Sequence, residues 1–465
     1  MAGMSALTAV ILAAGQGTRM RSTLPKVLHD LCGRPLVGWP IAAAREAGAS
    51  RVVVVDGPQR PLDGRLGDGV QVAVQPAPNG TGGAVLAAAE AIPAEGTVLV
   101  LAGDAPLVDG ETLRALLAAH EAGGAAATLL TAEHPDPTGY GRIVRDGDGL
   151  VERIVETKTA GDATPEQLAI REVNASVYAF DAAALHAALG RLRPDNAQGE
   201  LYLTDTVSIL RGDGRGVAAH VAGSWHVVLG VNDRAQLADV RALVQRRILD
   251  AHMRAGVTVI DPAATYVDAG VEIGPDTVLE PMTILRGATR VGSGSRIGPS
   301  ATLVDTRVGD GAAILNAHVV EAEIHDGVSV GPFAYLRPGT VLRAGSKAGT
   351  FVEMKNSDIG EGTKVPHLSY IGDADVGPGT NIGASNVTAN YDGVRKHRTR
   401  IGTGVKTAVD TTFVAPVEVG DHAWTGAGAV VREDVPEGAL AVGVPARIIE
   451  GYDARRRDRV VPSAE

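Results

Sequence analysis

Residues 271–303, VEIGPDTVLEPMTILRGATRVGSGSRIGPSATL, decide the fold of the second half of the chain. An aliphatic residue recurs there every six positions and is often followed by Gly. A period of six matches neither an amphipathic helix nor an alternating strand, so it indicates a repeat architecture. The regular positions in this stretch are Ile273, Leu279, Leu285, Val291, Ile297 and Leu303.

The same period continues, with breaks, from Val267 to about Pro436. We expect a parallel β-helix in which three hexads complete a coil of about 18 residues, with about nine coils stacked roughly 4.8 Å apart. A single coil cannot bury its own apolar face, so stability accumulates by stacking. The further residues expected to point inward are Val308, Ile314, Val320, Ile324, Val330, Leu336, Leu342, Ala348, Met354, Ile359, Val365, Ile371, Val376, Ile382, Ile401, Phe413 and Val419, with a long break from Ala389 to Arg400.

The composition restricts the class of protein. The net charge of −11 over 465 residues argues against nonspecific nucleic-acid binding. The single cysteine, Cys32, excludes an internal disulfide and fits a reducing compartment. The apolar run at 9–14 is short, has no basic segment before it and ends in a Gly-rich turn, so we do not expect it to be a signal peptide. No run of about 18 apolar residues could span a membrane. We therefore expect a soluble, cytoplasmic protein with neither nucleic-acid nor membrane partners, although Arg455, Arg456, Arg457 and Arg459 form a local basic tail.

The chain begins with a pattern suited to phosphate binding. Leu7–Leu12 has the composition of a buried strand and runs into a Gly-rich turn with Arg19, followed by Lys26. Glycines let backbone N–H groups approach oxygen atoms, and the two cations neutralise charge. The turn lacks the third Gly of a dinucleotide fingerprint and the Gly-Lys-Ser/Thr of a P-loop, so the pattern alone does not identify the ligand.

Alternating helical and strand patterns follow, which predicts an α/β domain. We expect helices at 36–47 and 83–91, strands at 51–55, 70–75, 97–101 and 227–229, and one long helix from Asp233 to about Ala255. The expected domains are therefore an α/β domain at 1–231, a linker helix at 232–256, a β-helix at 257–450 and a basic tail at 451–465.

Asp104 follows the expected strand at 97–101. Ligand crevices of α/β sheets form at the carboxyl ends of strands, and a carboxylate there commonly holds Mg²⁺. The alternative is that Asp104 only caps the turn before Pro106.

Arg337 and Lys355 lie 18 residues apart, each directly after an inward position. Their side chains should emerge one above the other at about 4.8 Å. Like charges that close repel unless an anion lies between them, so we expect a phosphate site; the alternative is two solvated cations that splay apart. His367 lies on the following coil, and the inserted loop with Asn390 and Tyr391 favours a catalytic over a structural role for it.

Together these motifs resemble one family, the bifunctional bacterial N-acetylglucosamine-1-phosphate uridylyltransferase / glucosamine-1-phosphate N-acetyltransferase. The resemblance covers nearly the whole chain, and the pairing of a nucleotidyltransferase motif with a hexapeptide array is highly specific. The motifs that carry it lie at 12–20 (LAAGQGTRM), 24–29 (LPKVLH), 196–200 (NAQGE), 351–355 (FVEMK), 367–370 (HLSY), 381–384 (NIGA) and 390–393 (NYDG).

The resemblance implies a Rossmann-like nucleotidyltransferase domain, a left-handed β-helix and a homotrimer. It implies acetyl transfer from acetyl-CoA to glucosamine-1-phosphate, then uridylyl transfer from UTP to N-acetylglucosamine-1-phosphate with release of pyrophosphate. The product, UDP-N-acetylglucosamine, is a bacterial wall precursor. Mg²⁺ would serve the second reaction.

The resemblance also assigns roles in the uridylyltransferase site. Arg19 and Lys26 would bind phosphate, and Asp104 with Asn232 would hold Mg²⁺. The remaining substrate-binding positions would be Leu12, Ala13, Ala14 and Gly15 in the turn, Gln75, Gly80 and Thr81 at the uracil, and Gly139, Glu156 and Asn174 at the sugar.

In the acetyltransferase site, the resemblance makes His367 the general base that takes a proton from the attacking amine. Glu353 is a candidate for orienting His367. The Ala427 N–H, with position 409, would face the thioester. The other substrate-binding positions would be Arg337, Lys355, Tyr370, Asn381, Ala384, Asn390, Tyr391 and Lys396.

The chain departs from the family pattern at a few positions. Gly83 stands where the family commonly has His, Asp56-Gly57-Pro58 replaces a Gly-His pair, and Ala408-Val409 replaces Gly-Ser. Val409 cannot donate the hydrogen bond of the family Ser, so we expect slower acetyl transfer unless water or Thr407 replaces it. Two rival functions remain at this stage: a monofunctional nucleotidyltransferase whose β-helix only trimerises it, and a catalytically silent assembly subunit.

Overall fold

The computed structural model describes residues 6–157, 163–196 and 198–452, so Ala197 of the 196–200 motif and the four arginines of the basic tail lie outside the described residues. The chain divides into two compact units, Met1–Val244 and Gln245–Glu465, with the division inside helix α7 (Arg234–Arg254). This helix agrees with the one expected from Asp233 to about Ala255. Within the described part of the chain, no helix is long and apolar enough to cross a membrane.

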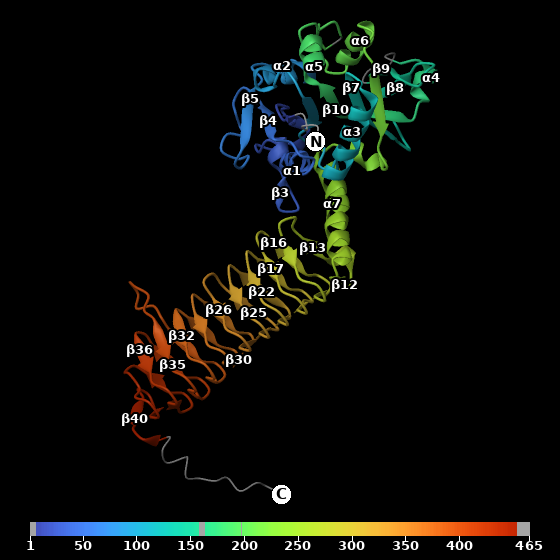
Figure 1. Ribbon diagram of the computed structural model, residues 1–465. Coiled ribbons are helices and arrows are strands. Elements are labelled where there is room, and N and C mark those ends of the chain that lie inside the picture. Colours follow the sequence, from blue (N-terminus) through green and yellow to red (C-terminus); the bar gives the residue numbers. More distant parts are fainter. Residues whose placement is uncertain (1–5, 158–162, 197, 453–465) are drawn as a thin grey trace. The chain divides into compact units, whose positions relative to one another are not determined.

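The first unit is built on a mixed sheet whose main path runs β11-β7-β10-β6-β1-β4-β5 (Figure 1). Four neighbouring pairs on this path are parallel: β11–β7, β6–β1, β1–β4 and β4–β5. β10 is antiparallel to both of its neighbours, β6 and β7. The bounds are β1 Leu7–Leu12, β4 Arg51–Asp56, β5 Val70–Val74, β6 Thr97–Ala102, β7 Ala127–Glu133, β8 Arg142–Arg145, β9 Val151–Val155, β10 Glu172–Asp181 and β11 Val217–Val221.

Helices cover this sheet, and alternate residues of each central strand enter two separate cores. Ile11 of β1 lies in one core and Val10 in the other, because successive side chains of a strand point to opposite faces. The helices are α1 Gly38–Glu46, α2 Thr81–Ala87, α3 Gly110–Gly123, α4 Pro165–Leu168, α5 Ala182–Leu189 and α6 Asp205–Gly212; short 3₁₀ turns are η1 Thr18–Met20, η2 Lys26–Leu28, η3 Ala89–Ala91 and η4 Trp225–Val228, and β2 Asp30–Leu31 pairs with β3 Arg34–Pro35.

The strand expected at Val227–Leu229 is wrong. Trp225–Val228 form the 3₁₀ turn η4, which Ser224 caps through its side chain. Val227 and Val228 are both buried, although neighbours in a strand would point to opposite faces. The β-branched pair therefore fills a core from a tight turn rather than from a sheet.

The second unit is a left-handed parallel β-helix with three faces (Figure 1). The first face holds β12 Thr258–Val259, β15 Val278–Leu279, β18 Arg296–Ile297, β21 Ala313–Ile314, β24 Ser329–Val330, β27 Lys347–Thr350 and β30 Lys364–His367. The second holds β13 Tyr266–Val267, β16 Ile284–Arg286, β19 Thr302–Val304, β22 Ala317–Val320, β25 Ala334–Leu336, β28 Glu353–Lys355, β31 Tyr370–Gly372, β33 Val387–Ala389, β35 Thr412–Val414 and β38 Val430–Val431.

The third face holds β14 Glu272–Ile273, β17 Arg290–Val291, β20 Arg307–Val308, β23 Glu323–Ile324, β26 Val341–Leu342, β29 Asp358–Ile359, β32 Ala374–Val376, β34 Thr399–Ile401 and β36 Val417–Val419. The short turn η5 (Pro262–Ala264) precedes β13. β37 (Trp424–Thr425), β39 (Leu440–Val442) and β40 (Arg447–Ile449) close the described end.

One core runs along this β-helix and contains nearly all the residues expected to point inward. Val320 is the exception. Val319 is fully buried and aligns with Leu303 and Leu336, whereas Val320 is only partly buried. The short coil between these strands holds fewer than 18 residues, which moves the inward position back by one.

Two kinds of residue form the corners of the coils: closely packed glycines at one corner and non-glycine residues with positive φ at another. After the third face, glycines lie so close to the next coil that a Cβ on Gly360 would come within 2.5 Å of the Pro378 nitrogen. Between the first and second faces, non-glycine residues such as Phe333, Phe351 and Leu368 adopt positive φ values of 49° to 59°. This conformation is uncommon for bulky residues, so the surrounding coils impose it.

Candidate functional site

In the first unit, the carboxyl ends of β1, β5 and β6 border a cavity of about 590 Å³. Strand ends that meet at one sheet edge bring together residues distant in sequence. Ala13 is buried and does not line the cavity, and neither Arg19 nor Lys26 lines it. The predicted site residues that do line it are Leu12, Ala14, Gly15, Gln75, Gly80, Thr81, Asp104, Gly139, Glu156, Asn174 and Asn232.

Cations and oxygen atoms meet where Asp104 and Asn232 border the cavity. The Lys26 ammonium contacts Asp104 Oδ2 and lies 3.4 Å from Asn232 Oδ1. Arg19 Nη2 donates to the same Asn232 oxygen at 2.9 Å. Asp104 Oδ2 and Asn232 Oδ1 thus both face the Lys26 ammonium. Oxygen atoms that converge on one cation in this way fit a hard cation such as Mg²⁺. The described residues contain no group of three His, Cys, Asp or Glu that could hold a metal, so a bound ion would need further oxygens from water and substrate.

The uracil end of the predicted site is ordered by a residue that the sequence analysis did not name. Gln75 Nε2 donates to Asn79 Oδ1 at 2.7 Å and to the Gly80 carbonyl at 3.0 Å. The Thr81 hydroxyl accepts the Leu203 N–H at 3.0 Å. A Cβ on Gly83 would overlap the Asn79 side chain, which explains why a larger residue is absent at that position. Gly83 stands where the family commonly has His, and this difference from the family pattern is the feature of the sequence that could have pointed to Asn79.

The sugar end depends on a bulge in β10 between Asn174 and Tyr178. Asn174 Nδ2 donates to the Tyr178 hydroxyl at 2.7 Å, and Ser176 adopts a positive φ of 55°. Burial raises the pKa of the Tyr178 hydroxyl, which therefore stays protonated. Tyr178 and Ser176 line the cavity but were not predicted.

The departure at Asp56 lies outside this cavity. The Asp56 carboxylate is fully buried and accepts the N–H groups of Gly57 at 2.7 Å and Leu62 at 2.9 Å. Asp56 therefore holds the loop after β4, and no contact with substrate follows from its position.

In the second unit, the predicted cation pair lies on consecutive coils of the second face, but each cation has a carboxylate. The Arg337 N–H donates to the Met354 carbonyl, which fixes the one-coil spacing to Lys355. Arg337 Nη1 lies 2.9 Å from Glu353 Oε1, and Lys355 Nζ lies 3.4 Å from both oxygens of Asp373. These carboxylates offset the repulsion between the two cations, so the repulsion does not by itself require a bound anion.

Glu353 does not orient His367. Its carboxylate binds Arg337, and within the described residues no hydrogen bond joins it to His367. His367 is exposed at the end of β30, where it aligns with Thr350 of β27. Its ring is free to meet a substrate from outside the coil.

His367, Ala384, Val409 and Ala427 follow one another along the corner after the first face. Ser385 N–H donates to the His367 carbonyl, Asp410 N–H to the Ala384 carbonyl and Gly428 N–H to the Val409 carbonyl. We call these four residues the corner column. Val409 is 46% exposed, so its side chain faces outward. Thr407 cannot replace the missing hydroxyl, because it is buried and accepts the Gly383 N–H at 2.8 Å.

The inserted loop at 389–400 is anchored on Asp373. Asn390 Nδ2 donates to Asp373 Oδ2 at 2.5 Å and lies 3.4 Å from the Tyr370 hydroxyl. Asn356 Nδ2 donates to Asp373 Oδ1 at 2.7 Å. The pKa of Lys355 is raised, first by its hydrogen bond with Lys396 and then by Asp373. The loop thus brings Lys396 to the predicted cation pair, while Tyr391 stays exposed.

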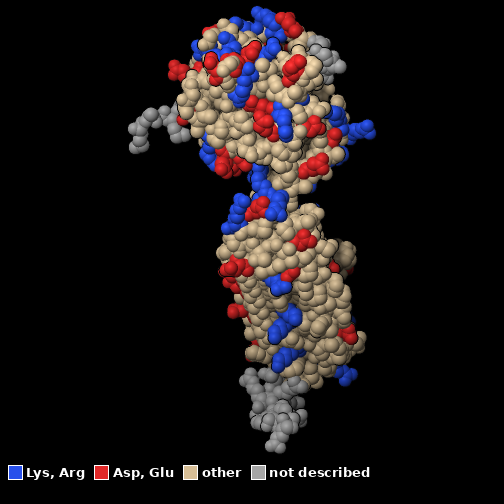
Figure 2. All heavy atoms as spheres, turned by 90° about the vertical axis from the view of Figure 1, so that its right-hand side faces the viewer, with Lys and Arg blue, Asp and Glu red and all other residues tan. Residues whose placement is uncertain are grey.

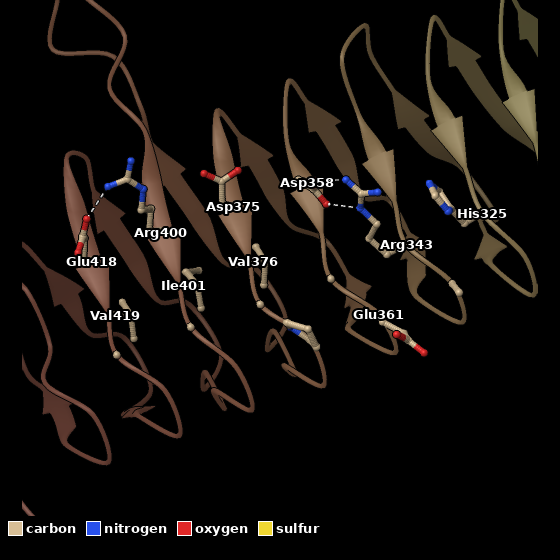
Figure 3. A pocket seen from close by; sticks show the side chains of 16 residues that line it. His325, Arg343, Asp358, Glu361, Asp375, Val376, Arg400, Ile401, Glu418 and Val419 are labelled. Atoms are coloured by element: carbon tan, nitrogen blue, oxygen red, sulfur yellow. Dashed lines mark hydrogen bonds and ion pairs between the residues drawn. The ribbon is translucent and has the colours of Figure 1, made fainter.

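A separate hollow of about 810 Å³ lies on the third face (Figure 3). Two pairs of its charged side chains bind each other: Arg343 lies 2.6 Å from Asp358, and Arg400 lies 2.6 Å from Glu418. The row of glycines along it is required by coil stacking. None of the predicted site residues lines it, so we assign it no chemistry.

Comparison with known proteins supports both units. A family model described as a MobA-like NTP transferase domain matches residues 9–147. A "Bifunctional protein GlmU" of Mycolicibacterium vanbaalenii is 56% identical over 459 residues, which cover 96% of this chain and 93% of the relative. The protein of the same name from Streptomyces avermitilis is 52% identical, and the match covers 98% of this chain and 96% of the relative. The one from Mycobacterium tuberculosis is 54% identical, and the match covers 96% of this chain and 92% of the relative.

The chain belongs to the GlmU family. This membership confirms the predicted family and the predicted bifunctional transferase. The roles of individual residues, the metal and the oligomeric state stay predictions.

Asp373 provides a test of how the GlmU-family site is held together. Burial acts to raise the pKa of its carboxyl, but hydrogen bonds from Asn356 and Asn390 and the charge of Lys355 lower it overall. Asp373→Asn should lower the free energy of unfolding at neutral pH by about 1–3 kcal/mol. A carboxyl with a lowered pKa stabilises the fold above the pKa of the unfolded chain, so the difference should narrow as the pH falls below about 4.

Denaturant titration measures this difference, and hydrogen exchange should show faster exchange in the loop at 389–400. Asp358→Asn is the matched control, because its ion pair with Arg343 is exposed and worth roughly 0–1 kcal/mol. Equal effects of the two substitutions would show that Asp373 does not anchor the loop.

Proposed function

We propose that the chain makes UDP-N-acetylglucosamine by two transfers, one in each unit. Acetyl transfer from acetyl-CoA to glucosamine-1-phosphate would use the second unit, and uridylyl transfer from UTP would use the first. The convergence of Lys26, Asp104 and Asn232 beside the cavity supports uridylyl transfer in the first unit. The corner column beside the cation pair supports acetyl transfer in the second unit.

For uridylyl transfer, the sugar phosphate would attack the α-phosphorus of UTP in line, so the protein mainly positions groups and neutralises charge. Arg19 and Lys26 would bind phosphate oxygens once these displace the contacts to Asn232 and Asp104. Gln75 and Thr81 would face the uracil. Asn174, which the Tyr178 hydroxyl holds in place, would bind the sugar.

Asp104 and Asn232 would hold Mg²⁺ at this site. A cation held by these two residues would supply positive charge that offsets the charge of the phosphates. Lys26, whose ammonium contacts Asp104 Oδ2, would add positive charge for the phosphates at this end of the cavity.

For acetyl transfer, the phosphate of glucosamine-1-phosphate would lie between Arg337 and Lys355. The phosphate would compete there with Glu353 and Asp373. Lys396 lies beside the pair, and its hydrogen bond with Lys355 lowers the pKa of Lys396. His367 would accept the proton of the amine as it attacks the thioester, a role that suits an imidazole near neutral pH.

The corner column limits where the acyl carrier can lie. Val409 is two coils from His367 and Ala427 is three, roughly 10 and 14 Å at 4.8 Å per coil. Side chains from His367 and Val409 can flank one thioester. The Ala427 N–H is too far from His367 in the same chain, so we place it against the pantetheine arm of acetyl-CoA instead of the thioester.

We also propose that copies of the chain assemble into a trimer along this corner. Met282, Phe333, Phe351 and Leu368 are all more than half exposed, and the Phe333 and Phe351 rings stack at 5.2 Å. An apolar ridge of this kind favours burial against a second copy. Sedimentation equilibrium that gave the mass of one chain would refute this assembly.

The two activities should separate by mutation, because their residues lie in different units. Asp104→Ala should abolish pyrophosphate release and leave thiol release from acetyl-CoA nearly unchanged. His367→Ala should slow thiol release by roughly 10²–10⁴ and spare pyrophosphate release. Parallel assays of free thiol and pyrophosphate on both variants test this, and a folded variant that lost both activities would contradict the assignment.

Val409→Ser should raise the rate constant of acetyl transfer. A hydroxyl at this outward position could donate to the developing oxyanion, and loss of one such donor can cost about 10²–10³ in rate. The KM for glucosamine-1-phosphate should hardly change. Val341→Ser, on the third face, is the matched control. A Val409→Ser variant no faster than the unaltered protein would show that position 409 does not face the thioester.

A further inference from the structure

Three lysines form a row along the first face of the β-helix. Lys347 aligns with Lys364, Lys364 with Asn381, Asn381 with Lys406, and Lys406 with Trp424. The three lysines and Asn381 are exposed, and each lies between buried neighbours, so these side chains point outward. Among the described residues, no ion pair joins any of the three lysines to a carboxylate.

Basic side chains gather in a line down the β-helix when it is viewed from the side that carries β12 and β30 (Figure 2). Aligned residues on neighbouring strands lie about 4.8 Å apart, so this row concentrates positive potential. Its charge complements a ligand with several phosphates. The net charge of the whole chain is −11, which makes the row a local exception.

Trp424 ends the row and gives it a flat apolar surface. Lys406 Nζ lies 4.8 Å from the centroid of the Trp424 ring, and Tyr452 meets that ring edge-on at 6.1 Å. Aromatic residues make up only 3% of the chain, and Trp424 is partly exposed on the outside of a narrow coil. A purine base stacks well on such a ring, and a lysine beside the ring can bind a phosphate.

The row runs parallel to the corner column. Lys406 and Trp424 each lie three residues before a member of that column, Val409 and Ala427 respectively. Three extended residues span roughly 10 Å. A carrier whose arm lies along the corner column therefore has Lys406 and Trp424 beside it, within reach of a nucleotide that bends back at the diphosphate.

We infer that Lys406 and Trp424 bind the 3′-phosphoadenosine diphosphate end of acetyl-CoA. The adenine stacks on Trp424 and displaces the Lys406 ammonium from the ring, and the ammonium then binds phosphate. This inference rests on the proposed acetyl transfer, and it adds a subsite that recognises the nucleotide rather than the acetyl group.

Steady-state kinetics with two acyl donors test the subsite, because acetylpantetheine carries the arm without the nucleotide. Trp424→Leu should raise the KM for acetyl-CoA about 5- to 50-fold, and Lys406→Gln should raise it about 3- to 10-fold. The KM for acetylpantetheine should not change in either variant. Lys347→Gln is the matched control on the same face, three positions along the row from Lys406, and should behave as the unaltered protein.

Tryptophan fluorescence gives a reading that does not depend on turnover. CoA should quench the tryptophan fluorescence of the unaltered protein more than pantetheine does. The Trp424→Leu substitution should remove this difference in quenching. Unchanged KM values for acetyl-CoA, or equal increases with both donors, would overturn the inference. Loss of the assembled mass in the variants would also overturn it, in favour of a contact between copies. Absence of acetyl transfer by the unaltered protein with either donor would refute the proposed function itself.

Discussion

The stacking of coils in the second unit is the constraint on which its structure and its chemistry both depend. Each coil presents one aliphatic side chain per face to the interior, and residues such as Leu285, Leu303 and Val319 align one above another. Backbone hydrogen bonds join each coil to the next, for example from Tyr335 to Val352 at 2.9 Å. No coil could bury these side chains alone, so each depends on its neighbours.

The same register places the functional side chains. Once Leu336 aligns with Met354, the next residues, Arg337 and Lys355, must project from the same face one coil apart. The corner column and the lysine row arise in the same way. The first unit instead brings together residues that lie far apart in sequence: Asp104 follows the carboxyl end of β6, Asn232 follows the turn η4, and both line one cavity.

The period of six was sufficient to predict the β-helix, because one inward residue per hexad leaves a direct trace in the sequence. It failed at Val320, where a shortened coil moves the inward position to Val319. The strand expected at Val227–Leu229 failed because two adjacent valines can fill a core from a 3₁₀ turn as well as from a strand. Periodicity reports which residues are buried and only indirectly which backbone buries them.

The site was predictable where family motifs mark it and less so where partners come from elsewhere. The cavity in the first unit gathers most of the predicted residues, but Asn79 and Tyr178 act through contacts that no spacing reveals. In the second unit, the cation pair was predicted, whereas its carboxylates were not. Asp373 belongs to the next coil and Glu353 had been assigned to His367, so only the structure shows which cation each one binds.

The central claim is that the aligned inward side chains hold the β-helix together, and a pair of neighbouring substitutions tests it most directly. Leu303 is fully buried between aligned coils, whereas Thr302 beside it faces outward on the same strand. The free energy of unfolding from denaturant titration should fall by about 2–5 kcal/mol in Leu303→Ala and by about 0.5 kcal/mol or less in Thr302→Ala. Equal losses from the two substitutions would contradict the account.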